Sequence, residues 1–196
     1  MKRLLLSLPL LCLCTLVQAK VVMPRFFADG MVLQQQTECR LWGTATPGAP
    51  LVVTASWTHG KWKSRVNADG SFSITITTPT AGGPFTISID DGEKTMLSNV
   101  LVGEVWICSG QSNMEMPMKG FKMQPVEGTT EELLRCKDAK MRLFTVKRHA
   151  AITPQTDVEG EWSEANSESV RNFSATAYYF GRALRQQLDV PVGLIV

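Results

Sequence analysis

Apolar and polar residues alternate strictly in two neighbouring runs of the chain. In Ser71–Thr77 the apolar positions are Phe72, Ile74 and Ile76, and the run Phe85–Ile89 repeats the same period. Successive side chains of a β-strand point to opposite faces, so this pattern predicts half-buried antiparallel strands with one solvated face. Turn signals separate these runs from their neighbours, at Pro47-Gly48, His59-Gly60, Asn67-Ala68-Asp69-Gly70, Ala81-Gly82-Gly83 and Asp91-Gly92.

A β-hairpin is predicted just before these two runs. Residues Leu51–Trp57 and Lys61–Val66 are rich in strand-forming residues, and Thr58-His59-Gly60 joins them. Strands and turns of this kind continue to about residue 100. We therefore expect residues 20–100 to form a β-sandwich or jelly-roll-like module.

The pattern changes at Val100. The run Val100–Cys108 is almost continuously apolar, which indicates a strand buried on both faces, as in a parallel sheet. A second strand is expected at Met141–Val146, a helix at Ser169–Leu188 and a further strand at Val192–Val196. The buried face of the helix is predicted from apolar residues three or four apart, at Val170, Phe173, Ala177, Phe180, Leu184 and Leu188.

Strands alternating with a helix predict α/β architecture for residues 101–196. The last predicted strand is apolar and neither a polar tail nor a closing helix follows it. We therefore expect this second domain to be truncated.

The first nineteen residues have the form of a secretory signal peptide. Lys2 and Arg3 precede the apolar stretch Leu4–Val17, and Ala19 ends a small-residue cleavage site. The alternative is a membrane anchor, but the stretch is shorter than the ~20 apolar residues that a spanning helix needs. The sequence predicts a secreted or periplasmic protein without a membrane anchor after cleavage.

Charge and cysteine content narrow the function classes. Removal of Lys2 and Arg3 leaves 18 cationic and 18 acidic side chains, without a basic run, so nucleic acid is not an expected partner.

Cys12 and Cys14 lie in the predicted signal peptide, which leaves Cys39, Cys108 and Cys136. Three cysteines permit one disulfide and one free thiol, and the spacing does not select the pair. No Cys-x-x-Cys or paired histidine spacing is present, so neither a metal nor a cofactor is expected.

Ser112 follows the carboxyl end of the predicted strand that ends at Cys108. Open α/β sheets bind their ligands at this edge, and Gly110 permits a sharp turn that would aim the Ser112 amide at an oxyanion. The alternative from the local sequence alone is a polar turn without a catalytic role.

The residues around Ser112 carry a resemblance to a known family. The block Val102–Met116, which contains Ser109-Gly110-Gln111-Ser112-Asn113-Met114-Glu115, closely resembles the nucleophile block of sialate O-acetylesterases, a family of SGNH-type serine hydrolases. The resemblance extends over residues 21–196, with further matching stretches at Phe27–Gln34, Trp42-Gly43, Asn67–Gly70, Arg142–Phe144, Asn172–Ala175 and Tyr178–Arg182. It implies that the second domain is the first part of a flavodoxin-like, three-layer hydrolase domain.

The resemblance implies that Ser112 is a nucleophile that attacks an acetyl ester of a sugar and forms an acetyl-enzyme, with its own amide as one oxyanion donor. A serine needs a base, and the base needs an orienting carboxylate. The family supplies them as Asp-x-x-His, which is absent from this chain. His59 lies in a hairpin turn, and His149 is expected to lie exposed in a loop. We therefore expect the base and its orienting acid to be missing.

Several other residues have two interpretations. Gln111 and Asn113 flank Ser112 and either bind substrate or support the loop. Glu115 has no second carboxylate to pair with, as glycoside hydrolysis would require, so a supporting role is expected. Trp57 and Trp62 either pack across the hairpin or stack a sugar.

Three hypotheses follow for the function. The first is an esterase that acts on O-acetylated sialic acids. The second is an esterase with the same serine chemistry that acts on acetylated plant polysaccharides. The third is a catalytically inactive fragment whose β-rich module is associated with carbohydrate.

Overall fold

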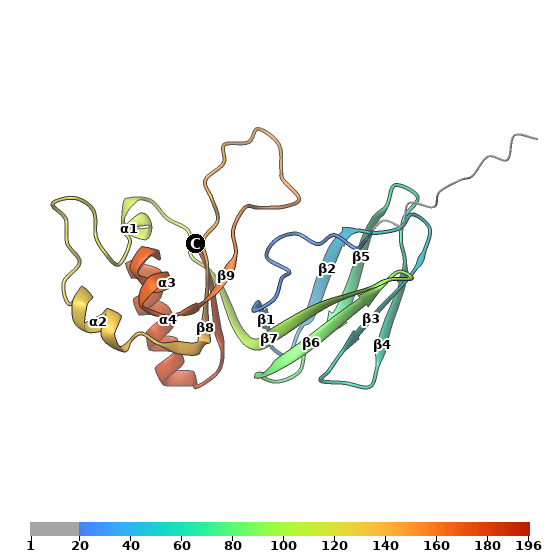
Figure 1. Cartoon of the computed structure of the whole chain (residues 1–196), viewed down its shortest axis with the longest axis horizontal. Coiled ribbons are helices and arrows are strands. Elements are labelled where there is room, and N and C mark those ends of the chain that lie inside the picture. The colour runs from blue at the N-terminus through green and yellow to red at the C-terminus, as the bar shows by residue number, and fades with distance from the viewer. Residues whose placement is uncertain (1–19) are drawn as a thin grey trace, which may run out of the picture.

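The computed structural model describes residues 20–196, and the predicted signal peptide 1–19 lies outside them. Seven strands come first along the chain, and the helices and strands that follow them lie to their left in Figure 1. These strands are β1 (Val32–Gln34), β2 (Glu38–Thr44), β3 (Pro50–Ala55), β4 (Lys61–Arg65), β5 (Ser71–Thr77), β6 (Gly82–Asp90) and β7 (Lys94–Ile107).

The N-terminal strands enclose one hydrophobic core. Strands β4, β3, β6 and β7 pair antiparallel in that order, β1 pairs parallel with β7, and β2 pairs with β5 in a separate two-stranded sheet. In β5 the side chains of Phe72, Ile74 and Ile76 are buried and the alternate ones face outward, as the period of two predicts. The two sheets share the core formed by Leu41, Val53, Ile76, Ile87, Ile89 and Val100, among others. A full sandwich or jelly-roll topology stays a prediction.

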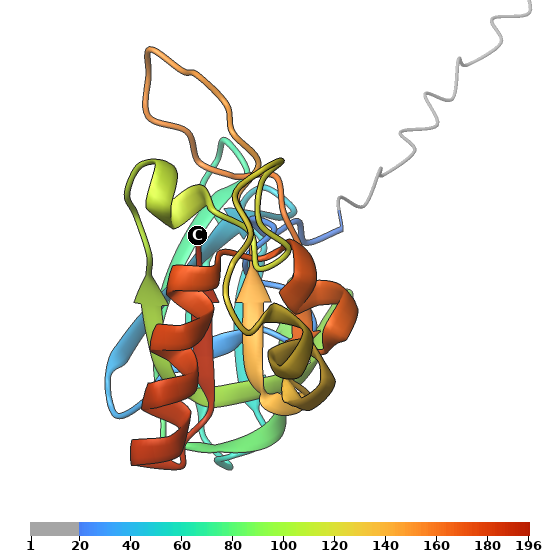
Figure 2. The same cartoon turned by 90° about the vertical axis from the view of Figure 1, so that its left-hand side faces the viewer.

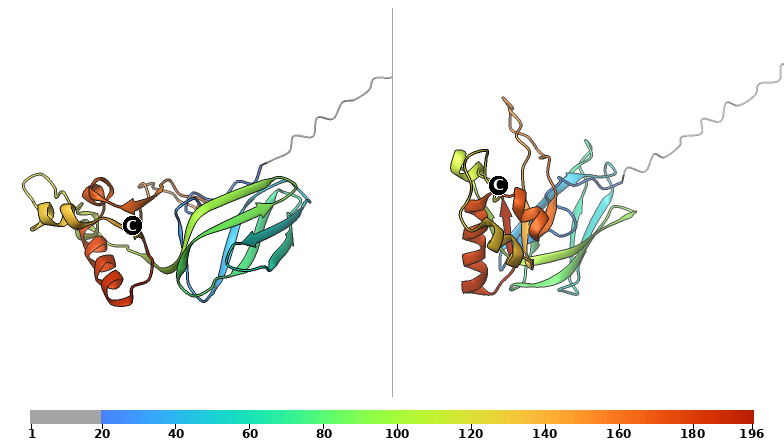
Figure 3. Two further views of the ribbon diagram at one scale, coloured as in Figure 1. Left: turned by 60° about the horizontal axis from the view of Figure 1, so that its bottom comes forward. Right: turned by 60° about the vertical axis from the view of Figure 1, so that its left-hand side comes forward.

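The predicted hairpin is present. Strands β3 and β4 are antiparallel neighbours, with Val53 opposite Trp62 and Thr54 opposite Lys61. The β2 and β5 strands lie across the core from this hairpin (Figures 1 and 3).

Strand β7 belongs to both halves of the molecule. Its first part pairs with β6, as Ile87 with Leu97, and its last part pairs parallel with β10 (Val192–Ile195), from Glu104 to Ile107. The predicted boundary between residues 100 and 101 falls inside this continuous strand. Division into domains at that point stays a prediction.

The C-terminal half places helices on one side of a short parallel array. Its elements are α1 (Ser112–Glu115), α2 (Thr129–Arg135), β8 (Asp138–Phe144), β9 (Trp162–Ala165), α3 (Ser167–Asn172), α4 (Ala175–Leu188) and β10. Strand β10 lies between β7 and β8, parallel to both, and β9 adds an antiparallel edge. The helices lie on one side of these strands, and the N-terminal strands lie on the other (Figures 1 and 2).

The prediction of one helix from Ser169 to Leu188 is wrong. Helix α3 ends at Asn172, and α4 begins at Ala175. Phe173 is extended, and its carbonyl accepts a hydrogen bond of 2.9 Å from the Met118 amide. Ser174 then caps α4 by accepting from the Ala177 amide. The apolar spacing continues through the break, so periodicity alone does not reveal it.

Part of the predicted buried surface is exposed. Within Val100–Cys108, burial ends after Gly103, and Trp106 and Ile107 are 42% and 79% exposed. Phe180 and Leu188, which were expected on the buried face of the helix, are 39% and 50% exposed. Trp106 packs edge-to-face on Phe180 instead, with ring centroids 5.1 Å apart. The parallel pairing of β7 was nevertheless predicted correctly.

Two further sequence features can be compared with residues 20–196. Cys39, Cys108 and Cys136 are all free thiols in this part of the chain. Among the helices found there, none has both the length and the apolar character needed to cross a membrane.

The buried Arg142 joins the two halves of the molecule. Its guanidinium, from β8, donates to the carbonyl of Gly30 and to Asn99 Oδ1 at 3.2 and 3.1 Å, and lies 3.1 Å from Glu164 Oε1 on β9. The side chain is only 4% exposed. Three segments that are remote in sequence therefore meet at one cation.

We expect Arg142→Ala to lower the free energy of unfolding by about 3 kcal/mol, because it removes the hydrogen bonds of a buried guanidinium and leaves the buried Gly30 carbonyl without this donor. Urea denaturation followed by circular dichroism measures this change. Lys140→Ala, two residues away on the same strand and half exposed, is the control and should change stability by less than about 0.5 kcal/mol. Equal effects of the two variants would contradict the role given to Arg142.

Glu132 is a second buried charge, and it ties α2 to α4. Its carboxylate accepts a 2.7 Å hydrogen bond from the Tyr178 hydroxyl and pairs with Arg135 and Arg182. Burial acts to raise the pKa of Glu132, but the hydrogen bonds from Arg182, Tyr178 and Arg135 outweigh it and lower the pKa. A lowered folded-state pKa means that the charged form is favoured in the folded protein.

The stability that Glu132 adds is therefore present above its unfolded-state pKa of about 4.3, and is lost as the pH falls through the folded-state pKa. We expect Glu132→Gln to reduce stability at pH 7 and to flatten the loss of stability below about pH 5. Urea titrations at several pH values measure both effects. Glu131→Gln, an exposed neighbour on the same helix, should reproduce neither.

Candidate active site

The loop that carries Ser112 begins where β7 ends. The Cys108 amide makes the last hydrogen bond to β10, donating to the Ile195 carbonyl at 2.7 Å. The chain then turns so tightly that a Cβ on Gly110 would lie 2.9 Å from the Cβ of Met114. The Gln111 carbonyl accepts from the amides of Met114 and Glu115, at 2.9 and 3.0 Å, which starts α1. A glycine is required at position 110 by this close approach.

Ser112 is the first residue of α1 and is exposed. Within residues 20–196, neither its hydroxyl nor its backbone amide makes a hydrogen bond, while its carbonyl accepts from the Met116 amide at 3.1 Å. The backbone around Ser112 is therefore ordered by internal bonds, and the two groups that acyl transfer would use remain available.

Gln111 and Asn113 support the loop through their backbones. The Asn113 carbonyl accepts from the Thr176 hydroxyl at 3.0 Å, which connects the loop to α4, and the Gln111 carbonyl starts α1. Their side chains are exposed and make no hydrogen bond in the described part of the chain. A substrate-binding role for these two side chains stays a prediction.

The break between α3 and α4 holds the segment that follows Ser112. The Ala175 amide donates to the Met116 carbonyl at 2.9 Å, and the Met118 amide donates to the Phe173 carbonyl at the same distance. The Ser174 hydroxyl contacts Met114 Sδ at 3.4 Å. The extended residues at the break thus provide backbone groups that a continuous helix would have used internally.

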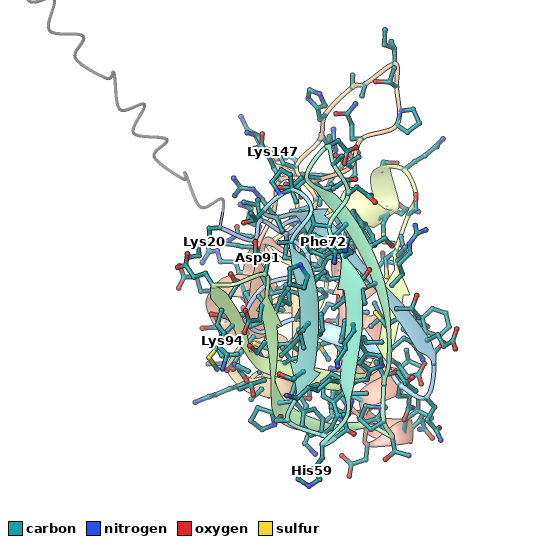
Figure 4. The ribbon with its side chains drawn as sticks, turned by 90° about the vertical axis from the view of Figure 1, so that its right-hand side faces the viewer. Lys20, His59, Phe72, Asp91, Lys94 and Lys147 are labelled. Atoms are coloured by element: carbon teal, nitrogen blue, oxygen red, sulfur yellow. The ribbon has the colours of Figure 1, made fainter. Side chains whose placement is uncertain are left out.

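The two histidines lie in different places. His59 is at the tip of the β3–β4 hairpin, at the opposite end of the molecule from Lys147, which follows β8 (Figure 4). His149 is exposed in the loop after β8 and lines a cavity of about 980 Å³ together with Arg25, Lys147 and Val196. Ser112 does not line this cavity. No histidine or carboxylate of residues 20–196 hydrogen-bonds to Ser112.

One contact beside Ser112 was not foreseen from the sequence. Arg148, in the loop after β8, forms an ion pair with Glu115 on α1. The strands β7, β10 and β8 are parallel, so their carboxyl ends meet at one edge, and this pair joins the loops that follow β7 and β8. Glu115 therefore has a supporting contact, and no sequence signal connects it with Arg148.

A reactive thiol and a metal centre are the two other kinds of site considered at this edge. Burial raises the pKa of the Cys108 thiol, which disfavours the reactive thiolate form. In the part of the chain that the structure describes, no group of three or more His, Cys, Asp or Glu side chains is arranged to hold a metal ion.

Comparison with known proteins identifies relatives of most of this chain. The chain is 30% identical over 188 residues to the sialate O-acetylesterase of Homo sapiens, covering 87% of this chain and 35% of that protein. It is 29% identical over 183 residues to the sialate O-acetylesterase of Mus musculus, covering 84% and 33%. The chain thus spans about a third of the length of these relatives. No family model matches it.

A solved structure shares the fold. A carbohydrate acetylesterase from Xanthomonas citri superposes with a TM-score of 0.83 at 29% sequence identity, covering 90% of this chain and 39% of that one. The mixed sheet and its helices therefore match those of an acetylesterase. On these grounds the chain belongs, over the part that it spans, to the sialate O-acetylesterase family.

Proposed function

We propose that this chain carries the nucleophile of a carbohydrate esterase that removes O-acetyl groups from sugars. The observation that carries the proposal is the position of Ser112, whose exposed hydroxyl follows the carboxyl end of the parallel strand β7 and makes no hydrogen bond within residues 20–196. The relatives, a sialate O-acetylesterase and a carbohydrate acetylesterase, support an acetylated sugar as substrate.

The reaction proceeds in two steps. Ser112 Oγ attacks the acetyl carbonyl while a base takes its proton, and the Ser112 amide donates to the oxyanion of the tetrahedral intermediate. The C–O bond to the sugar breaks, the proton passes to the sugar oxygen, and an acetyl-serine remains. Water then attacks this ester in the same way, which releases acetate and restores the hydroxyl.

The base and the acid that orients it come, in this proposal, from outside residues 20–196. Support comes from the absence of any histidine or carboxylate hydrogen-bonded to Ser112 in this region, and from the separate cavity that His149 lines. The 196-residue chain alone then has little or no esterase activity, because an unassisted serine hydroxyl is a weak nucleophile at neutral pH.

The substrate is proposed to be an O-acetylated sialic acid, which the names of the curated relatives favour. Acetylated plant polysaccharide is the alternative acetyl sugar. The location is proposed to be outside the cytoplasm, secreted or periplasmic, because residues 1–19 have the pattern of a cleaved signal peptide.

In the native full-length protein, we expect a fluorophosphonate probe to label Ser112, because the probe reacts with activated serine hydroxyls. Ser112→Ala should remove the label and lower acetate release by about 10³-fold or more. Ser109→Ala is the matched control, an exposed serine of the same loop, and should retain both. Peptide mass spectrometry locates the label, and a folded native protein that stays unlabelled would refute the proposal.

Acetate release separates the two substrate classes. We expect the full-length protein to have a higher kcat/KM on O-acetylated sialic acid than on acetyl-xylan, and the 196-residue chain alone to stay near the uncatalysed rate on both. Acetyl-xylan as the better substrate would favour the plant-polysaccharide alternative. Turnover by the short chain that Ser112→Ala abolishes would disprove an external base.

A further inference from the structure

A second hollow surface lies at the end of the β3–β4 hairpin. A cavity of about 390 Å³ is lined there by Trp57 and Trp62, with Lys61 and Thr77 beside them. Small-molecule sites in proteins combine apolar or aromatic walls with a few polar groups, in cavities of roughly 300–1,000 Å³. Both the size and the lining of this cavity fall in that class.

The cavity continues into a larger hollow. A neighbouring cavity of about 710 Å³ shares Thr77, Thr78 and Pro79 with the first, and its other wall contains Gln36 and Glu38. We call the two together the hairpin groove. Its first half is aromatic, and its second half is lined by hydroxyl, amide and carboxylate side chains.

The two tryptophans are held differently. The indole N–H of Trp57 donates to the Thr77 carbonyl at 3.2 Å, and its ring packs edge-to-face on Phe85 at 5.3 Å. The rings of Trp57 and Trp62 are 6.4 Å apart and tilted by 57°, so they do not cover each other face to face. Trp62 is partly exposed on the edge strand β4, and its N–H makes no hydrogen bond in the described chain.

Polar side chains along the hairpin groove are also available. The Lys61 ammonium, the Thr77 hydroxyl, the Gln36 amide and the Glu38 carboxylate make no hydrogen bond or ion pair within residues 20–196. They are exposed, so water solvates them in the free protein. Lys61 and Thr77 line the same cavity as the partly exposed Trp62 indole, and Gln36 and Glu38 line the neighbouring one.

We propose that the hairpin groove is a second, non-catalytic site that binds neutral pyranose units of a glycan. A pyranose ring has C–H groups on a face and hydroxyls around its rim, which match an indole face bordered by donors and acceptors. One cation, Lys61, and one carboxylate, Glu38, face the groove, so its charge selects neither an anionic nor a cationic sugar.

The hairpin groove is remote from Ser112. It adjoins His59 at one end of the β-rich part, whereas Lys147, in the loop joined to α1 by the Arg148–Glu115 pair, lies at the opposite end (Figure 4). Figure 1 shows α1 on the far side of the molecule from β3 and β4. Binding in the groove therefore does not involve Ser112, and the proposal does not depend on the esterase activity.

Tryptophan fluorescence of the native full-length protein, titrated with xylohexaose and with lactose, tests this site. We expect saturable binding of at least one neutral sugar, weakened about tenfold or more by Trp62→Ala and by less than about threefold by Trp62→Phe, which keeps an aromatic face. Trp106→Ala is the matched control, because Trp106 is an exposed tryptophan outside the groove, and should bind normally. Ser112→Ala should also bind normally.

A second variant covers the case in which Trp62→Ala does not fold. Thr77→Arg places a long side chain into the groove from an exposed position of β5 and should abolish binding without removing a packed residue. Titration with 3′-sialyllactose tests the sugar class, because binding of this sugar without binding of lactose or xylohexaose would overturn the neutral-pyranose proposal. Failure of every sugar to bind, or sugar binding by both Trp62→Ala and Thr77→Arg as tight as that of the unsubstituted protein, would overturn the site itself.

Discussion

Strand β7 is the constraint on which the rest of the structure depends. One continuous strand pairs antiparallel with β6, parallel with β1 and, in its last residues, parallel with β10. The register of the N-terminal sheet therefore fixes where the carboxyl end of β7 lies, and with it the loop of Ser112. Gly103 stands at the change of partner, where a side chain would collide with the Pro191 carbonyl. The side chain of Arg142, on β8, then connects this strand to Asn99 of β7 and to Glu164 of β9.

Local sequence predicted strands such as β5, because their burial follows the period of two, but it did not predict β9. It failed at the break between α3 and α4. There Phe173 and Ser174 are not helical, and they contact Met118 and Met114 instead. Contacts between residues so far apart in sequence have no local signature. It failed again at Trp106 and Ile107. Their apolar character predicts burial, but these last two residues of β7 are exposed. Both errors lie at the edge that carries Ser112.

The candidate site was predictable to the same extent. A buried strand followed by a glycine turn and a serine places Ser112 at the carboxyl edge of a parallel array, and the structure puts it there. The Arg148–Glu115 pair and the carbonyl bonds to the α3–α4 break were not predictable, because they join segments on separate loops. Position along a strand can be derived from sequence, whereas the contacts that make a loop rigid depend on how distant segments pack.

The way in which the loop is supported has a consequence for catalysis. The bonds that order it use backbone carbonyls of Gln111, Asn113 and Met116, and they leave the hydroxyl and amide of Ser112 without partners in the described chain. A nucleophile held by backbone groups keeps its position whether or not a base is present, so little conformational entropy is lost when the base and substrate arrive. In the proposed reaction, positioning of the serine and its activation are therefore separable properties, and residues 20–196 would supply the first.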